Sequence, residues 1–321
     1  MVPIKIKIQF AEVHFLTIET LLRHHIQRVI DDGGVWKRPR TSPHYKIGLS
    51  QKLLALLNSF LSPASTILRD LICISPSDLT QYVENLNNFH PTYITKTDND
   101  YKILYNIFID SVYDDSTTFS KSDFINKIDI NTCPYCNRNY IYSVNKRKVV
   151  KPEIDHFFPK TIYPILAVSY FNLIPSCEPC NGLGAKKQND PRDVGLINPY
   201  LLKASQFRFS LKIKNVSIIN PLCGKTDIEV FFKGKIQSHC DIFNLEDLYS
   251  LHHDHAIELV IKKRLKYSKN QRAYLNSYNG LKFNKAEIDR MILGNYSLES
   301  EQHKRPLSKL YQDIGKELGL L

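Results

Sequence analysis

The pattern of apolar and polar residues changes twice along the chain, at about residues 128 and 200. Met1 to Phe10 alternates apolar residues with Lys5 and Lys7, a pattern that predicts a strand. Beyond it, apolar residues recur at helical intervals up to about residue 128. The first part of the chain is therefore expected to be mostly helical after one short strand.

Four segments of this part carry the clearest helix signals. Leu53 to Leu61 has the apolar density of a core helix, and Tyr101 to Val112 places its aromatic residues on one face. The run Ser75-Pro76-Ser77-Asp78 supplies capping residues and an early proline, which predicts a helix over Leu79 to Leu86. A short helix over Ser122 to Ile128 is expected to lead directly into the central segment.

The pattern after residue 200 begins with strands. Phe207 to Ile213 alternates apolar and polar residues, and Ile228 to Phe232 is rich in residues that favour strands. Gly234 predicts a turn into a third strand, Lys235 to Cys240. Three helices are then expected, over about Leu245 to Lys266, Lys285 to Leu293, and Ser308 to Leu318.

Composition narrows the class of protein. With 321 residues the chain is long enough for about two domains of roughly 150 residues each, and 43% of its residues are apolar, enough for a packed core. No apolar run approaches the roughly 20 residues that a membrane helix needs. The first residues do not have the pattern of a secretory signal. We therefore expect a soluble, cytoplasmic protein.

Basic residues outnumber acidic ones, and the formal net charge is +11. Such a balance favours encounter with polyanions, and contacts between Lys or Arg and phosphates would make binding depend on salt. Charge alone does not identify a ligand. Beside a hydrolytic site, however, it favours phosphodiesters over peptides as the substrate.

Two C-x2-C pairs flank the central segment: Cys133 with Cys136, and Cys177 with Cys180. Two sulfurs from one tight turn can bind the same ion, and a second pair completes a tetrahedron. The spacing therefore predicts a structural zinc site that joins two segments far apart in the sequence. The alternative is four thiols without a metal, which would leave a small, loop-rich segment poorly stabilised.

The reactive residues are expected between the two cysteine pairs and directly after the second pair. Asp155 and His156 are adjacent, and Asn181 directly follows the second pair. Carboxylate and amide oxygens suit a hard cation such as Mg²⁺ or Mn²⁺, and a neutral imidazole can take a proton from water near neutral pH. On an ideal strand Asp155 and His156 would point to opposite faces, whereas Glu153 and Asp155 would share one. Glu153 is therefore an alternative metal ligand.

Residues 133–181 resemble the HNH endonuclease superfamily, also called the ββα-metal or His-Me fold. The resemblance rests on Asp155-His156, on Asn172-Leu173, and on the Cys-x2-Cys-Asn ending. It implies that His156 is the general base, that Asp155 and Asn181 hold a catalytic ion, and that Asn172 braces the loop between two strands. The chain carries Asn181 in the third place of the motif, where an amide oxygen is still a competent ligand.

The resemblance gives the fold class and the reaction. We expect an α+β protein with mainly helical flanking regions, residues 1–128 and 201–321, around a zinc-stabilised ββα module over residues 129–200. A small β segment is expected at the start of the last region. The implied reaction is metal-dependent hydrolysis of nucleic-acid phosphodiester bonds, with DNA favoured over RNA. Candidate phosphate contacts, each of which could instead be a solvated surface charge, are Lys160, Lys186, Lys187, Lys146 and Arg147.

A wider resemblance concerns biological role. The stretches EIDHFFPK and NLIPSC, and the later segment Phe243 to Tyr249, resemble bacterial defence nucleases of the Septu type. That resemblance implies a role in antiphage defence beside an ATPase of the ABC or SMC type. Two alternatives stay open: a zinc-stabilised protein that binds nucleic acid or assembles without catalysis, and a restriction-type nuclease that works alone.

Two further groups of residues attract attention. His252 and His255 would share a helix face while Asp254 would point elsewhere, so a solvated or partner-facing helix is favoured over a second metal site. The cysteines outside the two pairs are expected to be small buried thiols: Cys73, Cys223 and Cys240.

Overall fold

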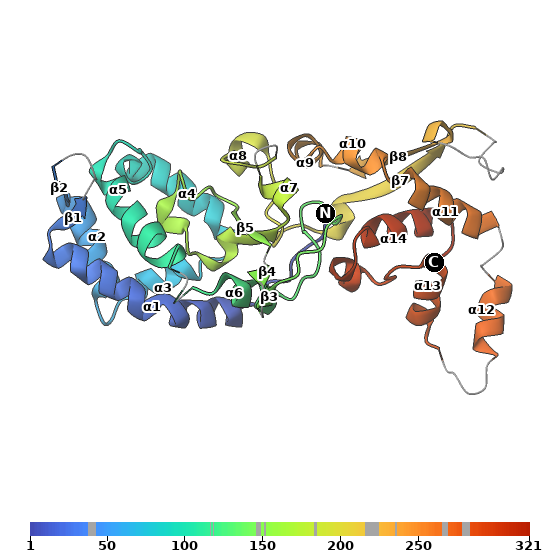
Figure 1. The fold of residues 1–321 in the computed structure, drawn as a ribbon, viewed down its shortest axis with the longest axis horizontal. Helices are drawn as coiled ribbons and strands as arrows, with labels where there is room; N and C mark the ends of the chain where they lie inside the picture. The colour runs from blue at the N-terminus through green and yellow to red at the C-terminus, as the bar shows by residue number, and fades with distance from the viewer. Residues whose placement is uncertain are drawn as a thin grey trace.

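The computed structural model describes residues 1–37, 43–115, 117, 119–145, 149–150, 152–182, 185–215, 225–234, 236–264, 269–277 and 283–321. The molecule is elongated, with the N-terminal helices at one end, the C-terminal helices at the other, and the central segment between them (Figure 1). Within the described residues, every named strand pairs with one neighbour in a two-stranded antiparallel sheet. The fold is therefore mixed α and β, and helices make up most of it.

The N-terminal region is helical, and its longest helix is α1 (Ile8–Asp31). A hairpin of β1 (Gly34–Lys37) and β2 (Tyr45–Gly48) follows it. The further elements of this region are α2 (Gln51–Leu61), α3 (Ile67–Ile72), α4 (Asp78–Phe89), α5 (Asn99–Tyr105), the π-helical segment η2 (Asn106–Tyr113) and α6 (Lys121–Ile128). Because the buried residues of α1 recur every three or four positions, one face of it packs against α2, α3 and η2. The helices predicted within this region are confirmed, except that the segment Tyr101 to Val112 passes from α5 into the π-helical η2.

The strand predicted at the start of the chain is wrong. Residues 1–7 form no strand, and α1 already covers the last three residues of the predicted one. Val2 and Ile4 are buried. Their backbone N–H groups donate to the carbonyls of Pro134, at 2.9 Å, and Pro199, at 3.0 Å. The alternating apolar residues are thus buried against two separate loops of the central segment, with single hydrogen bonds in place of a strand ladder.

The central segment contains a short hairpin followed by a short helix. β5 (Glu153–His156) pairs antiparallel with β6 (Leu173–Ser176), and α7 (Glu178–Asn181) follows at once. The loop between the strands, residues 157–172, is almost entirely buried. The neighbouring elements are β3 (Val144–Asn145), β4 (Val149–Val150) and α8 (Pro191–Val194).

The C-terminal region begins with the two strands that the sequence predicts, β7 (Phe207–Ile213) and β8 (Ile228–Gly234). The third predicted strand, Lys235 to Cys240, is wrong, because α9 (Gln237–Phe243) occupies most of it. His239, Cys240 and Phe243 are buried at helical spacing, so the helix places them on one side.

The remaining helices are α10 (Leu245–Ser250), α11 (His253–Arg264), α12 (Lys269–Asn276), α13 (Lys285–Leu293) and α14 (Ser308–Glu317). The single helix predicted from Leu245 is thus two helices, and its predicted end, Lys266, lies outside the described residues. The two last predicted helices are confirmed, and α12 was not predicted.

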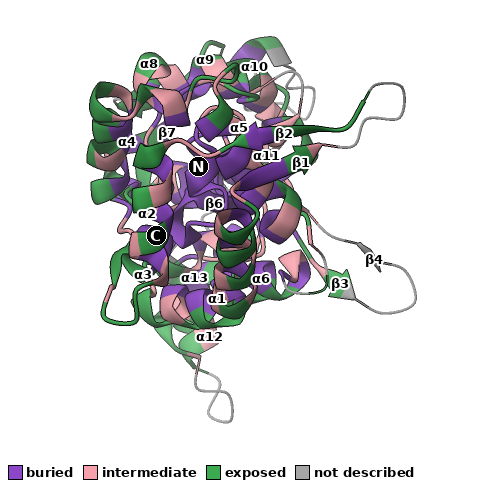
Figure 2. Ribbon diagram, turned by 90° about the vertical axis from the view of Figure 1, so that its left-hand side faces the viewer, coloured by how far each residue is buried: buried purple, intermediate pink, exposed green. Residues whose placement is uncertain are grey.

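Buried apolar residues from all three regions belong to one hydrophobic cluster. Figure 2 shows them filling the interior, while the outward sides of the helices are exposed. The central segment is therefore held from both sides. None of the described helices combines the length and the apolar character needed to cross a bilayer.

Candidate active site and cysteine cluster

The four cysteines of the two C-x2-C pairs meet in one buried cluster. Their sulfur atoms all lie within 4.8 Å of one another, and none of them forms a disulfide. Sγ of Cys136 lies 3.8 Å from Sγ of Cys177, which matches the edge of a tetrahedron with metal–sulfur bonds of about 2.3 Å. Four sulfurs at this spacing fit a metal ion such as zinc.

The four thiols of this cluster influence one another. The hydrogen bond with Cys133 is the first cause that lowers the pKa of Cys136 and of Cys177, whereas burial raises the pKa of Cys133 and hydrogen bonds with the other thiols raise that of Cys180. The backbone N–H of Arg138 lies 3.3 Å from Sγ of Cys136, and the side-chain amide of Asn139 lies 3.3 Å from Sγ of Cys177. Donors aimed at sulfur stabilise the charged form that binds a metal.

Of the residues predicted for the catalytic site, Asp155, His156 and Asn181 line a cavity of about 300 Å³, and Asn172 does not. Asp155 and His156 reach it from β5, and Asn181 reaches it from the end of α7. Asp155 and His156 are both buried and both line this cavity, while their side chains bond to different partners, Tyr135 and Lys186 for Asp155 and Ala167 for His156. The other lining residues are Tyr113, Lys121, Ile154, Pro159, Lys160, Thr161, Lys187 and Gln188.

The imidazole of His156 is held in one orientation. Its Nε2 lies 3.0 Å from the carbonyl oxygen of Ala167. A carbonyl oxygen only accepts, so Nε2 carries the proton and Nδ1 carries the lone pair. Burial, and then the positive charge of Lys160, holds the pKa of His156 well below its usual 6.5. The ring is therefore neutral at pH 7 and able to accept a proton.

The carboxylate of Asp155 accepts two hydrogen bonds. The hydroxyl of Tyr135 donates to Oδ2 at 2.6 Å, and the ammonium of Lys186 donates to Oδ1 at 3.2 Å. Lys186 also donates to the carbonyl of His156 at 2.7 Å, and its side chain is fully buried. A phosphate contact by Lys186, which the sequence suggested, is thus not available in this structure, because the ammonium faces Asp155.

Asn181 and Glu153 form a pair at the edge of the site. The amide nitrogen of Asn181 donates to Oε2 of Glu153 at 2.6 Å. Within the described residues, no group of three His, Cys, Asp or Glu ligand atoms within 4.8 Å of one another includes Asp155 or Glu153. The fit to a hard cation therefore rests on Asp155 and the amide oxygen of Asn181, and Mg²⁺ commonly binds with few protein ligands and several waters.

Asn172 fastens the loop that follows β5. Its Oδ1 accepts from the N–H of Phe158 at 2.7 Å, and its Nδ2 donates to the carbonyls of Phe158, at 3.1 Å, and Leu166, at 3.0 Å. The side chain is fully buried. Because Ala167 follows Leu166, this amide also fixes the carbonyl that orients His156.

Lysines line the cavity, and two of them, Lys121 and Lys160, also pair with Asp114 at 3.7 Å and 3.6 Å. Lys121 and Lys160 flank Tyr113, with their ammonium nitrogens 4.1 Å and 4.2 Å from its ring centre, and Lys187 is exposed at the rim. Lys121 lies on α6, more than 30 residues before Asp155, so no sequence motif connects it to the site. Of the predicted basic contacts, Lys146 and Arg147 lie outside the described residues.

His252, Asp254 and His255 bring three ligand atoms within 4.8 Å of one another, contrary to the orientation predicted for Asp254. However, Nε2 of His252 accepts a hydrogen bond from Nε of Arg138 at 3.0 Å. That bond occupies the lone pair with which a neutral imidazole would bind a metal. His255 bonds to the hydroxyl of Tyr311 at 2.7 Å. In this structure His252, just before α11, contacts Arg138, which follows the first cysteine pair, and His255 of α11 contacts Tyr311 of α14.

The other cysteines lie away from the cluster. Cys240 is buried and Cys73 is half-buried. Burial raises the pKa of these thiols to about 12 and about 11, so both are protonated at neutral pH. Cys223 lies outside the described residues.

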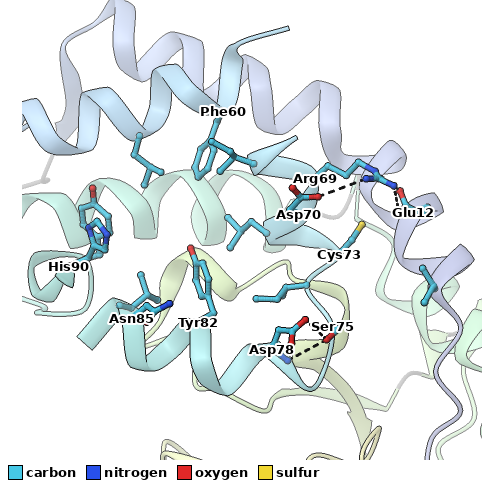
Figure 3. A pocket seen from close by; sticks show the side chains of 17 residues that line it. Glu12, Phe60, Arg69, Asp70, Cys73, Ser75, Asp78, Tyr82, Asn85 and His90 are labelled. Carbon is cyan, nitrogen blue, oxygen red and sulfur yellow. Dashed lines mark hydrogen bonds and ion pairs between the residues drawn. The ribbon is translucent and has the colours of Figure 1, made fainter. Parts of the chain in front are cut away.

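A larger cavity, of about 720 Å³, lies among the N-terminal helices (Figure 3). None of the residues predicted for the active site lines it. Its basic side chain, Arg69, forms a two-pronged ion pair with Glu12, and Asp70 and Asp78 add negative charge. A polyanion is therefore disfavoured there.

Comparison with known proteins gives one partial similarity. Over 88 residues the chain is 38% identical to the Septu protein PtuB of Bacillus thuringiensis. The match covers 26% of this chain and 31% of PtuB, so it spans less than a third of that relative. No family model matches the chain, and no solved structure matches it. The similarity supports a relationship to a Septu protein over this part of the chain.

Proposed function

We propose that this chain is a metal-dependent endonuclease of the HNH type that hydrolyses phosphodiester bonds in nucleic acid, with DNA as the favoured substrate. One observation carries the proposal: a neutral, oriented His156 shares a lysine-lined cavity with Asp155 and Asn181. The β5–β6 hairpin and the helix α7 that follows support it further, because this is the order of elements in a ββα-metal module.

The residues of the cavity divide the chemistry among them. His156, with Nδ1 unprotonated, takes a proton from the attacking water. Lys160 and Lys187 attract the phosphate and orient it. Asp155 and Asn181 would hold a divalent ion, which supplies charge neutralisation at the phosphoryl oxygen and the leaving oxygen. The cysteine cluster, holding zinc, keeps α7 and therefore Asn181 at the wall of the cavity.

The partial similarity to PtuB supports a role for the chain in antiphage defence. We extend the proposal to a complex with an ATPase of the ABC or SMC type, in which the ATPase controls when the nuclease acts. Co-expression with such an ATPase and copurification through a tag on either protein tests the partnership. Full cleavage activity of the isolated chain, with no ATPase retained, would instead favour a nuclease that works alone.

The decisive experiment measures cleavage and metal content together. Purified protein is incubated with supercoiled plasmid, single-stranded DNA and tRNA in Mg²⁺ or Mn²⁺, alone and with the ATPase. His156→Ala should abolish cleavage while the zinc content stays at the wild-type level. If His156→Ala cleaves as fast as the wild type, His156 is not the base and the proposed mechanism is excluded.

A second candidate function is nucleic-acid binding without catalysis. It is favoured by the fact that both oxygens of Asp155 already accept hydrogen bonds, so the carboxylate is satisfied without an ion. Asp155→Ala separates the two functions. If the chain is a nuclease, Asp155→Ala should lose nearly all cleavage while still binding DNA. If it only binds nucleic acid, neither the wild type nor Asp155→Ala should show metal-dependent cleavage.

A further inference from the structure

The tyrosine inside the first cysteine pair reaches the candidate metal ligand. Tyr135 lies between Cys133 and Cys136 in the sequence, so the turn that presents two sulfurs also fixes its backbone. Its hydroxyl donates to Oδ2 of Asp155 at 2.6 Å, and both side chains are almost completely buried, at 1% and 3% exposure. The aromatic ring stacks on Phe243, with centres 4.6 Å apart. The phenol therefore has little freedom to leave Asp155.

The second cysteine pair delivers the other donor to the same carboxylate. The backbone N–H of Lys186 bonds to the carbonyl of Cys180 at 3.4 Å, and the ammonium of Lys186 bonds to Oδ1 of Asp155 at 3.2 Å. Oδ2 of Asp155 thus accepts from Tyr135, within the first cysteine pair, and Oδ1 accepts from Lys186, which is bonded to the second pair. The cluster and the carboxylate form one connected unit, although they lie on different strands and turns.

We propose that Tyr135 is a positioning residue that fixes the carboxylate of Asp155 for binding of a divalent cation, and that it thereby makes this second metal site depend on the cysteine cluster. This inference rests on the proposed function for the role of Asp155 as a ligand. It goes beyond that function by assigning a role to a residue of the structural cluster that neither coordinates metal nor touches substrate.

Partners that orient a metal ligand have a characteristic effect when they are removed. Their loss typically weakens metal affinity or activity by about 10- to 100-fold and leaves the ligand itself in place. Tyr135→Phe removes the oxygen alone, and the ring can keep its stacking on Phe243. We therefore expect Tyr135→Phe to bind Mn²⁺ about 10- to 100-fold more weakly than the wild type, with its zinc unchanged.

Tyr249 offers a matched control. It is also fully buried, and its hydroxyl donates to the carbonyl of Cys136 at 2.6 Å. Tyr249→Phe therefore removes a hydrogen bond of the same length from the same cysteine pair, but one that does not touch Asp155. Any effect through general loosening of the cluster should appear in both variants, whereas an effect through Asp155 should appear only in Tyr135→Phe.

The experiment titrates zinc-loaded protein with Mn²⁺ and follows free Mn²⁺ by electron paramagnetic resonance, with zinc measured on the same samples. Asp155→Asn serves as the variant that lacks the carboxylate. The inference is supported if Tyr135→Phe weakens Mn²⁺ binding at full zinc content and Tyr249→Phe does not. It is overturned if the wild type binds no Mn²⁺, if Tyr135→Phe binds as the wild type does, if Tyr135→Phe loses zinc, or if both phenylalanine variants weaken binding equally.

Cleavage assays on the same samples separate this inference from the proposed function. A wild type that binds Mn²⁺ through Asp155 but cleaves no nucleic acid would remove the nuclease proposal. The role of Tyr135 would then still be decided by the Mn²⁺ titration alone.

Discussion

The ammonium nitrogen of Lys186 lies 3.2 Å from Oδ1 of Asp155, and neither side chain is accessible to solvent beyond 3%. Loss of one partner of an ion pair this deeply buried is strongly destabilising, because the other charge then stays in the interior without compensation. The same ammonium also bonds to the carbonyl of His156. Lys186 therefore keeps a negative charge in the interior and fastens the end of β5 at the candidate site.

Lys186→Met should destabilise the protein by about 3–5 kcal/mol, because it leaves the carboxylate of Asp155 buried without its positive partner. Urea unfolding of the zinc-loaded protein measures the loss. Lys187→Met, at the exposed neighbouring position, is the matched control and should stay within about 0.5 kcal/mol of the wild type. Equal stability of the two variants would show that the ion pair contributes nothing.

The sequence predicts those parts of the site that depend on short covalent spacing. Two residues between paired cysteines place both sulfurs of a pair on one tight turn, and the need of a metal ion for four ligands predicts that the two pairs meet. Asn181 directly follows Cys180 in the sequence. Helices with regular apolar spacing, such as α13 and α14, are also predicted closely, because their period is local information.

The contacts that the sequence does not predict are tertiary. The pairing of Lys186 with Asp155 spans 31 residues, and nothing near Lys186 distinguishes it from the exposed Lys187. Val2 and Ile4 alternate as in a strand, but no strand of the described part of the chain pairs with them. In both cases the environment that decides the outcome comes from a distant segment.

Removal of one cluster cysteine should release the metal and loosen the central segment. We expect Cys177→Ser to retain much less than one equivalent of zinc, because a tetrahedral site loses one of its four thiolates. Cys240→Ser is the control, since this cysteine is also buried but lies outside the cluster. Zinc analysis and limited proteolysis check the prediction. Full zinc retention by Cys177→Ser would contradict the four-sulfur site.

Asn172→Ala should impair cleavage more than its effect on folding explains. The substitution leaves the buried N–H and carbonyl of Phe158 without the partner that Asn172 provides, which costs about 1–3 kcal/mol for each group. It also removes one of the two hydrogen bonds to the carbonyl of Leu166, which keeps the bond from the N–H of Ser169, and so loosens the loop that orients His156. Asn198→Ala is the control, because its buried amide bonds to Phe171, near the end of the loop, and to Tyr200, and not to Phe158 or Leu166. Cleavage rates are compared at a temperature where both variants are folded. Equal rates would show that Asn172 acts on stability alone.

Acid should weaken the packing of α1 against the loop that carries the site. His14 of α1 bonds to the carbonyl of Val168 at 2.9 Å, and burial lowers its pKa to about 4. The unfolded chain binds a proton at this histidine below about pH 6.5, but the folded chain does not until about pH 4. Stability is therefore lost as the pH falls through this window, by up to about 3 kcal/mol from this group.

His14→Gln tests that assignment, because glutamine can still donate to a carbonyl but does not titrate. Between pH 6.5 and pH 4 the free energy of unfolding should fall for both proteins, and the fall should be about 3 kcal/mol smaller for His14→Gln than for the wild type. His24→Gln alters an exposed histidine of the same helix and should follow the wild-type curve. Parallel curves for all three proteins would mean that carboxylates alone set the acid sensitivity.

The lysines of the cavity should contribute to DNA binding in a way that net charge does not explain. For duplex DNA, the slope of log K against log salt changes by about 0.9 for each phosphate contact. In a His156→Ala background that prevents cleavage, Lys160→Gln with Lys187→Gln should therefore reduce the slope by about 2. Lys212→Gln with Lys316→Gln removes the same charge from exposed positions on β7 and α14 that do not line the cavity. If the two pairs reduce the slope equally, binding follows the overall charge of +11, and the cavity is not where the phosphate backbone is held. A reduction confined to the first pair would place a phosphate within reach of His156, because Lys160 and His156 line the same cavity.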